Sequence, residues 1–297
     1  MALAGCRYHS GVVRVGFRIV DVFTDRPLAG NQLCVVPDPG SISTETMQAL
    51  AREIGFSETT FVTSIGPDRY QMRIFTVTEE IPFAGHPSLG TAFVLATEGR
   101  TRTSMTQVTA SGQVQIDVDL AGRTARMEQL PPTFRLPVED AATVLKAAGL
   151  KPKDLRPDLP CQVVSTGLAH LLVPAVGEEV VRWAKPDPRV LPKALDQTGG
   201  TGLYLFAAEG ESVHARRFGL SVGIEEDAAT GSAAGPLGAY LVHHRVLPSG
   251  HLTIRQGMEI GRPSNMEVDV ERGRRRLRIH VGGGVVVVGD GSFVVPD

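Results

Sequence analysis

Cysteine is scarce in this chain, and its placement excludes several kinds of site. Only three cysteines occur among the 297 residues, at Cys6, Cys34 and Cys161. Their wide separation matches neither a zinc-binding nor a redox-active spacing, so we predict no metal site and no disulfide framework. Idle thiols of this kind are typical of a reducing compartment, which predicts a cytoplasmic protein.

An excess of either charge is also absent. Lys and Arg number 30 against 32 Asp and Glu, which gives a formal net charge of −2. This balance provides no electrostatic attraction to nucleic acid or to an anionic membrane surface. No apolar run is long enough to span a membrane. With neither nucleic acid nor a membrane indicated, we predict a small molecule as the partner.

The one basic cluster, at residues 272–278, is better explained by a hairpin than by a binding surface. A two-residue turn at Arg272-Gly273 predicts a register in which Asp269 lies opposite Arg276. Opposite charges would then face each other on the outer side of the hairpin, and the apolar residues between them would face inward.

Two segments of similar pattern indicate an internal duplication. Gly85-His86 in the first half and Gly231-Ser232 in the second each lead into an apolar segment with helical character. Upstream of them, Arg73-Ile74-Phe75 lines up with Arg216-Arg217-Phe218, and downstream each half ends in a predicted hairpin. Because these matches recur in one order, we predict an α+β protein of two similar domains.

Composition and the linker pattern agree with two domains. Hydrophobic residues make up 42% of the chain and charged residues 21%, as in globular proteins. Residues 129–137 contain three prolines and form the most linker-like segment. We therefore predict domains at residues 1–130 and 131–283, with residues 284–297 forming a strand that packs on the first domain.

The two aligned helix starts predict an anion site. A helix that begins near His86 or Ser232 directs free backbone N–H groups and its positive dipole end at whatever lies before it. Gly85 and Gly231 allow close approach of a ligand to the backbone. Asp227 precedes the second start, and a carboxylate beside an anion site favours proton transfer on an anionic small molecule.

Six further motifs run in one order along nearly the whole chain. They are Asp21-Val22-Phe23-Thr24, Gly30-Asn31-Gln32, Ser57-Glu58-Thr59-Thr60-Phe61, Phe83-Ala84-Gly85-His86-Pro87, Ser165-Thr166-Gly167-Leu168 and Glu226-Asp227-Ala228-Ala229-Thr230-Gly231-Ser232. In these motifs the sequence resembles the PhzF-like family, named for the phenazine biosynthesis isomerase. The resemblance implies a diaminopimelate epimerase-like fold, in which two domains related by pseudo-two-fold symmetry each wrap a mixed, largely antiparallel sheet around a central helix. It also implies an active site between the domains and no cofactor.

The resemblance assigns roles to particular residues. From the residues alone, Glu58 alternates with Phe56 on an apolar face, which is unfavourable unless the carboxylate is paired or functional, although most glutamates are simply solvated. The family match implies that Glu58 is the general base and then the general acid. His86, on sequence alone a helix cap or surface residue, and Asp227 are implied substrate contacts that assist proton transfer.

The same resemblance implies how the substrate is bound. Gly85 and Gly231 would supply backbone N–H groups to a substrate carboxylate, and Ser232 would add its hydroxyl. Two helix starts would then hold the anion without any arginine. Gln32, Ala228 and Gly219-Leu220-Ser221 depart from the family pattern, and these departures leave the substrate open.

We therefore predict a cofactor-independent isomerase that moves a proton between carbons of a small carboxylate. One alternative is an epimerase or racemase of an amino or hydroxy acid that uses Glu58 and Asp227 as opposed acid and base. A second is a non-catalytic ligand-binding protein on the same fold. The cysteine pair of related epimerases has no counterpart at Gly85 or Gly231. A homodimer is a further expectation.

Overall fold

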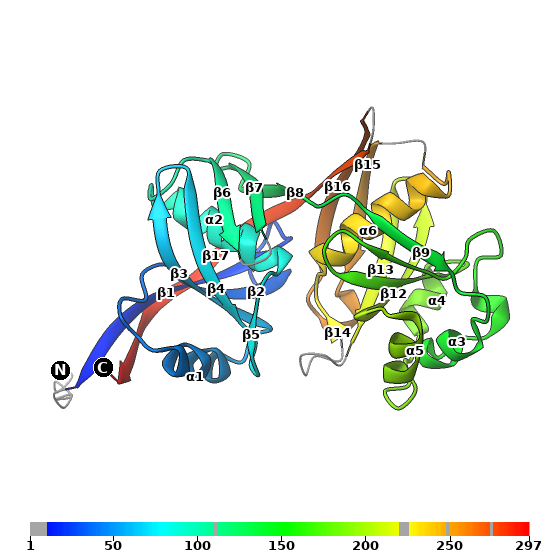
Figure 1. Ribbon diagram of the computed structural model, residues 1–297, viewed down its shortest axis with the longest axis horizontal. Helices are drawn as coiled ribbons and strands as arrows, with labels where there is room; N and C mark the ends of the chain where they lie inside the picture. The colour runs from blue at the N-terminus through cyan, green and yellow to red at the C-terminus, as the bar shows by residue number, and fades with distance from the viewer. Residues whose placement is uncertain (1–10, 110–111, 220–225, 248–249, 274–275, 297) are drawn as a thin grey trace.

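The computed structural model describes residues 11–109, 112–219, 226–247, 250–273 and 276–296. Within these ranges, seventeen strands form one continuous hydrogen-bonded network, and few helices pack on it. The α+β class predicted from the sequence is therefore confirmed. Two lobes lie side by side, and the two ends of the chain lie together at the far end of one lobe (Figure 1).

The first lobe contains the strands and helices of the N-terminal part. They are β1 (Val12–Val22), β2 (Asn31–Val36), α1 (Thr44–Ile54), β3 (Glu58–Gly66), β4 (Arg69–Phe75), β5 (Glu80–Ile81), α2 (Gly85–Thr97), β6 (Ser104–Thr109), β7 (Gly112–Asp119) and β8 (Thr124–Glu128). Helix α2 packs on β1, β2 and β8, and almost all of its residues are buried. Helix α1 is amphipathic, and it ends at Gly55 as the sequence predicts.

The second lobe contains the remaining elements. They are β9 (Thr133–Pro137), α3 (Ala142–Ala148), β10 (Gln162–Ser165), β11 (Ala169–Pro174), α4 (Glu178–Trp183), α5 (Leu191–Thr198), β12 (Gly202–Glu209), β13 (Ser212–Phe218), β14 (Glu226–Asp227), α6 (Gly231–His243), β15 (Gly250–Gln256), β16 (Ser264–Arg272) and β17 (Leu277–Pro296), with single 3₁₀ turns at Pro152–Asp154 and Met258–Ile260. Helix α6 packs on β10, β16 and β17 and is as buried as α2. No helix in the described ranges is long and apolar enough to cross a membrane.

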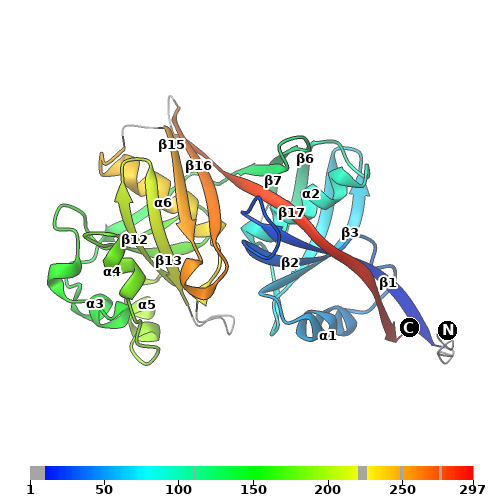
Figure 2. The same ribbon diagram turned by 180° about the vertical axis from the view of Figure 1, so that it is seen from behind.

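Strand β17 belongs to both lobes (Figures 1 and 2). Its first residues pair with β16, residues 280–284 pair with β8, and Val285–Pro296 pairs with β1. One apolar core continues across this connection, because the same cluster includes Leu89 of α2 and Leu237 of α6. The division into domains at residue 130 stays a prediction.

The residues aligned in the sequence fall on matching elements. Helices α2 and α6 each span 13 residues, and each begins at the aligned glycine. Arg73 at the end of β4 binds Glu80 of β5 through two hydrogen bonds, and Arg216 at the end of β13 binds Glu226 of β14 in the same way. Local geometry therefore repeats together with the sequence pattern.

The predicted register of the basic hairpin is wrong. Asp269 pairs with His280 rather than with Arg276, because Gly273 and Arg276 are themselves hydrogen-bonded and the loop lies beyond them. The observed register differs from the predicted one by an even number of residues, since Asp269 pairs with residue 280 and not with residue 276. An even difference preserves the face of the sheet on which each side chain lies. Val268 therefore still faces inward, whereas Arg278 pairs with Glu128 of β8.

Gly90 should be intolerant of even a methyl group. In an exposed helix, Gly→Ala stabilises by about 1 kcal/mol, but a Cβ at Gly90 would lie 2.6 Å from Leu33 Cδ2. We expect Gly90→Ala to lower the free energy of unfolding by about 1–3 kcal/mol, measured by urea denaturation. Gly16→Ala is the control, since a Cβ there meets nothing closer than 3.9 Å. A stabilised Gly90→Ala protein would contradict this packing.

Candidate active site

The N-termini of α2 and α6 have free backbone donors. Neither Ala84 nor Thr230, the residues that precede the two helices, caps its helix with a side-chain hydrogen bond. The first N–H groups of a helix have no partner within it, and the dipole makes this end positive. Each start is therefore suited to an anion.

The two helix starts lie against each other. A Cβ built on Gly85 would stand 3.6 Å from the backbone nitrogen of Ser232, and one built on Gly231 would stand 3.0 Å from the ring of Phe23. Side chains at these glycines would therefore separate the helices or displace their neighbours. The tightest of these contacts would be with Phe23 at Gly231 and with Met127 Cε, at 3.1 Å, at Gly85.

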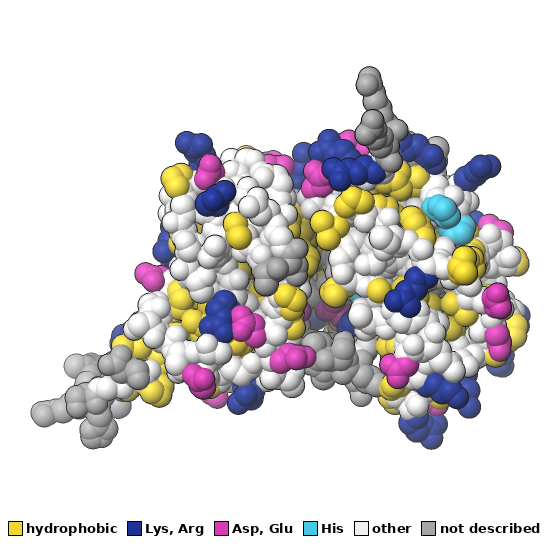
Figure 3. Space-filling view, in the orientation of Figure 1, with side chains coloured by type: hydrophobic (Ala, Val, Ile, Leu, Met, Phe, Trp, Pro, Cys, Tyr) yellow, Lys and Arg dark blue, Asp and Glu magenta, His cyan; other side chains and the backbone are white. Residues whose placement is uncertain are grey.

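Both starts open into one cavity between the lobes. It measures about 690 Å³, and its walls include Glu58, His86, Asp227 and Ser232. The space-filling view shows a hollow between the two halves of this face (Figure 3). The structure therefore brings all the predicted site residues to the wall of one cavity, although their roles stay predictions.

Glu58, at the start of β3, has one carboxyl oxygen without a partner. Its side chain is 15% exposed, and its Oε2 is buried with no hydrogen bond to any described residue. Burial raises the pKa of this carboxyl; the adjacent His86 opposes that shift, and the charge of Asp227 adds to it. A raised pKa allows Glu58 to hold and release a proton closer to neutral pH.

His86 stands between Glu58 and the backbone of β2. Its Nε2 lies 3.2 Å from the carbonyl oxygen of Gln32 and 3.6 Å from Glu58 Oε2. A carbonyl oxygen can only accept, so this contact assigns a proton to Nε2. In the neutral ring Nδ1 is then the acceptor.

Asp227 is held by both of its carboxyl oxygens. Asn31 of β2 donates to Oδ1 at 2.8 Å, and the Thr230 hydroxyl donates to Oδ2 at 2.6 Å. Asn31 also donates to the carbonyl of Ala229 at 2.9 Å, so a residue of the first lobe positions the loop before α6. These bonds leave Asp227 far less free to move than Glu58.

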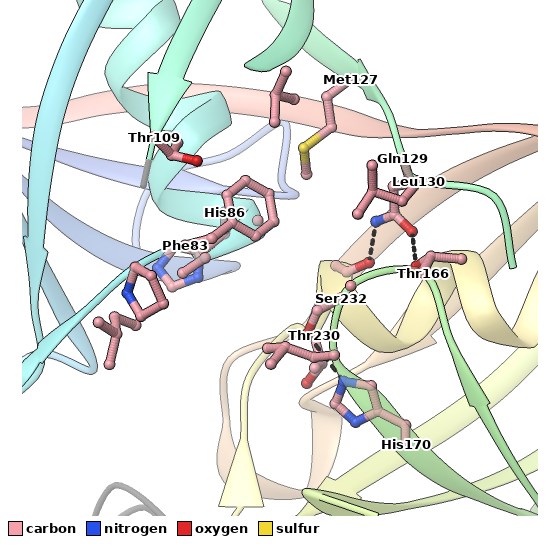
Figure 4. Close-up of a pocket in the computed structure, with 18 of the residues that line it drawn as sticks. Phe83, His86, Thr109, Met127, Gln129, Leu130, Thr166, His170, Thr230 and Ser232 are labelled. Carbon is pink, nitrogen blue, oxygen red and sulfur yellow. Dashed lines mark hydrogen bonds between the residues drawn. The ribbon is translucent and has the colours of Figure 1, made fainter. Parts of the chain in front are cut away.

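Three site residues have no assigned role in the sequence analysis. Gln129 donates to the carbonyl of Gly231 at 2.9 Å and accepts from Thr166 at 2.6 Å, and His170 Nε2 lies 3.1 Å from Ser232 Oγ (Figure 4). Burial, with a smaller effect of Arg217, lowers the pKa of His170 to about 3, so this ring is uncharged at neutral pH. Gln129 falls in the predicted linker and Thr166 in a family motif, but no local pattern marks His170.

One arginine joins the cavity wall, although the sequence analysis assigned no arginine to substrate binding. Arg217 of β13 lines the cavity. Strand alternation placed it there, and the sequence analysis used it only as part of an alignment. Residues 220–225 lie outside the described ranges, and with them Leu220 and Ser221 of the Gly219-Leu220-Ser221 departure.

Comparison with known proteins gives consistent matches over most of the chain. A family described as phenazine biosynthesis-like protein matches residues 20–291. The trans-2,3-dihydro-3-hydroxyanthranilate isomerase of Pseudomonas aeruginosa is 36% identical over 282 residues, covering 92% of this chain and 97% of that protein. The uncharacterized isomerase YddE of Escherichia coli O157:H7 is 33% identical over 281 residues, covering 91% and 95%.

A solved structure agrees with these matches. The phenazine biosynthesis protein of the PhzF family from Bacillus anthracis superposes with a TM-score of 0.87 at 28% identity, covering 95% of this chain and all of that one. The names of the relatives confirm the predicted enzyme class, an isomerase.

Stability should depend on the ionisation of Glu58. Because burial disfavours the charged form, the folded protein binds this proton more tightly than the unfolded chain, so stability falls as pH rises above the ordinary value of 4.5. We expect Glu58→Gln to melt at a higher temperature than the parent near neutral pH, and the difference to vanish below pH 4.5. Thermal melts of both proteins from pH 4 to 8 measure this.

The control for this pH series is Glu53→Gln, which changes an exposed glutamate on α1. Its melting temperature should follow that of the parent across the series. A Glu58→Gln protein less stable than the parent at neutral pH would contradict the cost assigned to the buried carboxylate.

Proposed function

We propose that this chain, which belongs to the phenazine biosynthesis-like protein family, moves a proton between two carbons of a small carboxylate without a cofactor. The membership itself bears out the resemblance seen in the motifs. The observation that carries the proposal is the position of Glu58, whose free, buried oxygen lies in the same cavity as two uncapped helix starts.

The helix starts bind the substrate carboxylate in this proposal. The backbone N–H groups at Gly85-His86 and Gly231-Ser232 donate to its oxygens. When the substrate loses a proton from a carbon conjugated with the carboxylate, negative charge spreads onto the same oxygens. Donors already aimed at that position stabilise the charge without reorganising.

Glu58 transfers the proton. Its ionised form removes a proton from one carbon, and the resulting neutral acid returns the proton to another carbon on the same face. The carboxyl is suited to both steps because burial and Asp227 raise its pKa, while His86 at 3.6 Å opposes the shift. His86 and Asp227 therefore assist by electrostatics and by contact with the substrate.

An epimerase that uses Glu58 and Asp227 on opposite faces is the alternative. Such a mechanism needs a second carboxylate able to exchange its proton. Both oxygens of Asp227 already accept hydrogen bonds, from Asn31 and Thr230, which favours the one-carboxylate isomerisation. The stereochemistry and position of deuterium incorporated in heavy water separate the two reactions, and a protein that only binds its ligand would incorporate none.

The relative named for trans-2,3-dihydro-3-hydroxyanthranilate suggests the first substrate to test. Its name describes a small carboxylate, which is the kind of ligand proposed here for the helix starts. Because Gly219-Leu220-Ser221 departs from the family pattern in the sequence, related carboxylates belong in the same screen.

Membership of this family also supports a proposal about how the two lobes are related. We propose that the lobes are the two predicted domains in a diaminopimelate epimerase-like arrangement, since Arg73–Glu80 and Arg216–Glu226 occupy matching places. A cytoplasmic location fits the two described cysteines, Cys34 and Cys161, which are buried and unpaired. The homodimer stays a prediction.

Removing the base tests the mechanism. Glu58→Gln keeps the size and polarity of the side chain, and a positioned acid or base contributes about 10²–10⁴-fold in rate. We expect the turnover number for the substrate to fall on that scale while folding, followed by circular dichroism, is unchanged. Asp227→Asn should lose activity partly through a higher KM. Glu53→Gln is the matched control with parental kinetics, and a Glu58→Gln enzyme at the parental rate would refute the assignment.

Carboxylate binding at the helix starts is testable without turnover. In a titration with acetate followed by amide NMR, the signals of Gly85, His86, Gly231 and Ser232 should shift together. The start of α1 is the internal control, because Ser43 already caps it through the amide of Thr46. Shifts confined to the α1 start, or absent from both cavity helices, would exclude the site.

A further inference from the structure

Two consecutive arginines on β13 have opposite environments. Arg216 is fully paired: it binds Glu226 through two hydrogen bonds and donates to the carbonyls of Val181, Arg182 and Ala184. Arg217 points to the other face of the strand and lines the cavity. The two side chains therefore serve different purposes, although both are largely buried.

The guanidinium of Arg217 lies in a slot made by two glycines. A Cβ on Gly202 would stand 2.7 Å from its Nε, and a Cβ on Gly219 would stand 2.8 Å from its Cζ. Any side chain at either position would displace the group. The absence of side chains at these two positions therefore leaves room for the guanidinium at this point of the cavity wall.

In the part of the chain that the structure describes, no carboxylate is hydrogen-bonded to this cation, although, against the larger effect of burial, its charge slightly lowers the pKa of Glu58. Arg217 is 9% exposed, and its buried Nε has no hydrogen-bond partner there. Within the described residues its hydrogen bonding is a single long contact, 3.5 Å from Nη2 to the carbonyl of Thr201. A buried guanidinium is unfavourable unless an acceptor offsets its lost hydration, and an oxyanion is the best geometric match to it.

Arg217 is connected to the first anion site but separate from it. His170 Nε2 contacts the Ser232 hydroxyl at the start of α6, while His170 itself pairs with Gly202, one wall of the slot. With its pKa of about 3, His170 is uncharged at neutral pH and does not compete for an anion as a cation would. The cavity wall thus carries two kinds of anion-binding donor, the backbone N–H groups of the helix starts and the guanidinium of Arg217, with a neutral ring between them.

We propose that Arg217 binds a second anionic group of the substrate, so that the preferred ligand is a dicarboxylate whose first carboxylate lies at the helix starts. This inference rests on the proposed function of the same cavity and narrows its substrate class. It also gives the arginine a role that backbone donors alone cannot fill, because a guanidinium provides two parallel donors to a planar carboxylate.

Calorimetric titration with matched ligands tests the proposal. Succinate, glutarate and adipate are compared with butyrate, valerate and caproate, which have the same chain lengths but one carboxylate. The titrations use the full chain carrying Glu58→Gln, so no turnover is needed. We expect the best dicarboxylate to bind about tenfold or more tightly than the monocarboxylate of the same chain length. This ratio is the gain in affinity expected from one hydrogen-bonded charged group.

Three variants in that background separate charge from structure. Arg217→Met keeps the length of the side chain and should bring the affinity ratio close to one, with monocarboxylate binding unchanged. Arg217→Lys retains a charge without the planar fork and should keep part of the preference. Arg189→Met, at an exposed arginine paired with Asp187 outside the cavity, should behave as the parent.

Two results would overturn the inference. One is a protein that shows no preference for dicarboxylates, or whose preference survives in Arg217→Met. The other is an Arg217→Met protein with a lower melting temperature in the absence of ligand and an unaltered ratio, which would make the arginine structural. If Glu58 does not transfer the proton, the turnover measurement on Glu58→Gln shows it. The ratios of dicarboxylate to monocarboxylate affinity are measured without turnover and do not depend on that result.

Discussion

The close approach of the N-termini of α2 and α6 is the constraint on which the cavity depends. Two positive helix ends repel each other, so other contacts have to hold them together. Asn31 binds Asp227 and Ala229 from across the cavity, and Gln129 binds the carbonyl of Gly231. Strand β17, which pairs in both lobes, joins the sheets behind these contacts. An anion between the helix ends relieves the same repulsion.

The charges of the cavity divide into a fixed set and a movable one. Asp227 is held by two donors, and Arg217 is buried beside two glycines that leave room for its guanidinium. Glu58 keeps one oxygen without a hydrogen bond to any described residue, and burial raises the pKa of its carboxyl. A negative ligand adds to the effect of Asp227, so its arrival further favours the protonated form of Glu58. In the proposed mechanism, binding of an anionic substrate therefore favours the step in which Glu58 holds the proton before returning it to carbon.

The sequence was sufficient for features that reside in short segments. Gly85 and Gly231 precede apolar helices and could be named from local pattern, whereas Glu58, His86 and Asp227 lie within compact motifs and their predicted roles came from the resemblance to a family. His170 and Arg217 could not, because they reach the cavity through the pairing of β11, β12 and β13, residues far apart in the chain. The register of the hairpin at Arg272 failed for a related reason. Its loop is selected by hydrogen bonding between Gly273 and Arg276, which the turn pattern alone did not reveal.

The chemistry arises where the two halves differ. The two halves share the ion pairs Arg73–Glu80 and Arg216–Glu226 at matching places. The residue that follows the arginine is Ile74 in the first half and Arg217 in the second. Ile74 is buried in the apolar core, whereas Arg217 faces the cavity. Likewise the aligned helix starts carry His86, beside Glu58, and Ser232, beside a neutral His170. In the proposed mechanism, two similar helix ends bind the anion, while the residues in which the halves differ place the proton-transferring Glu58 on one side and the additional positive charge of Arg217 on the other.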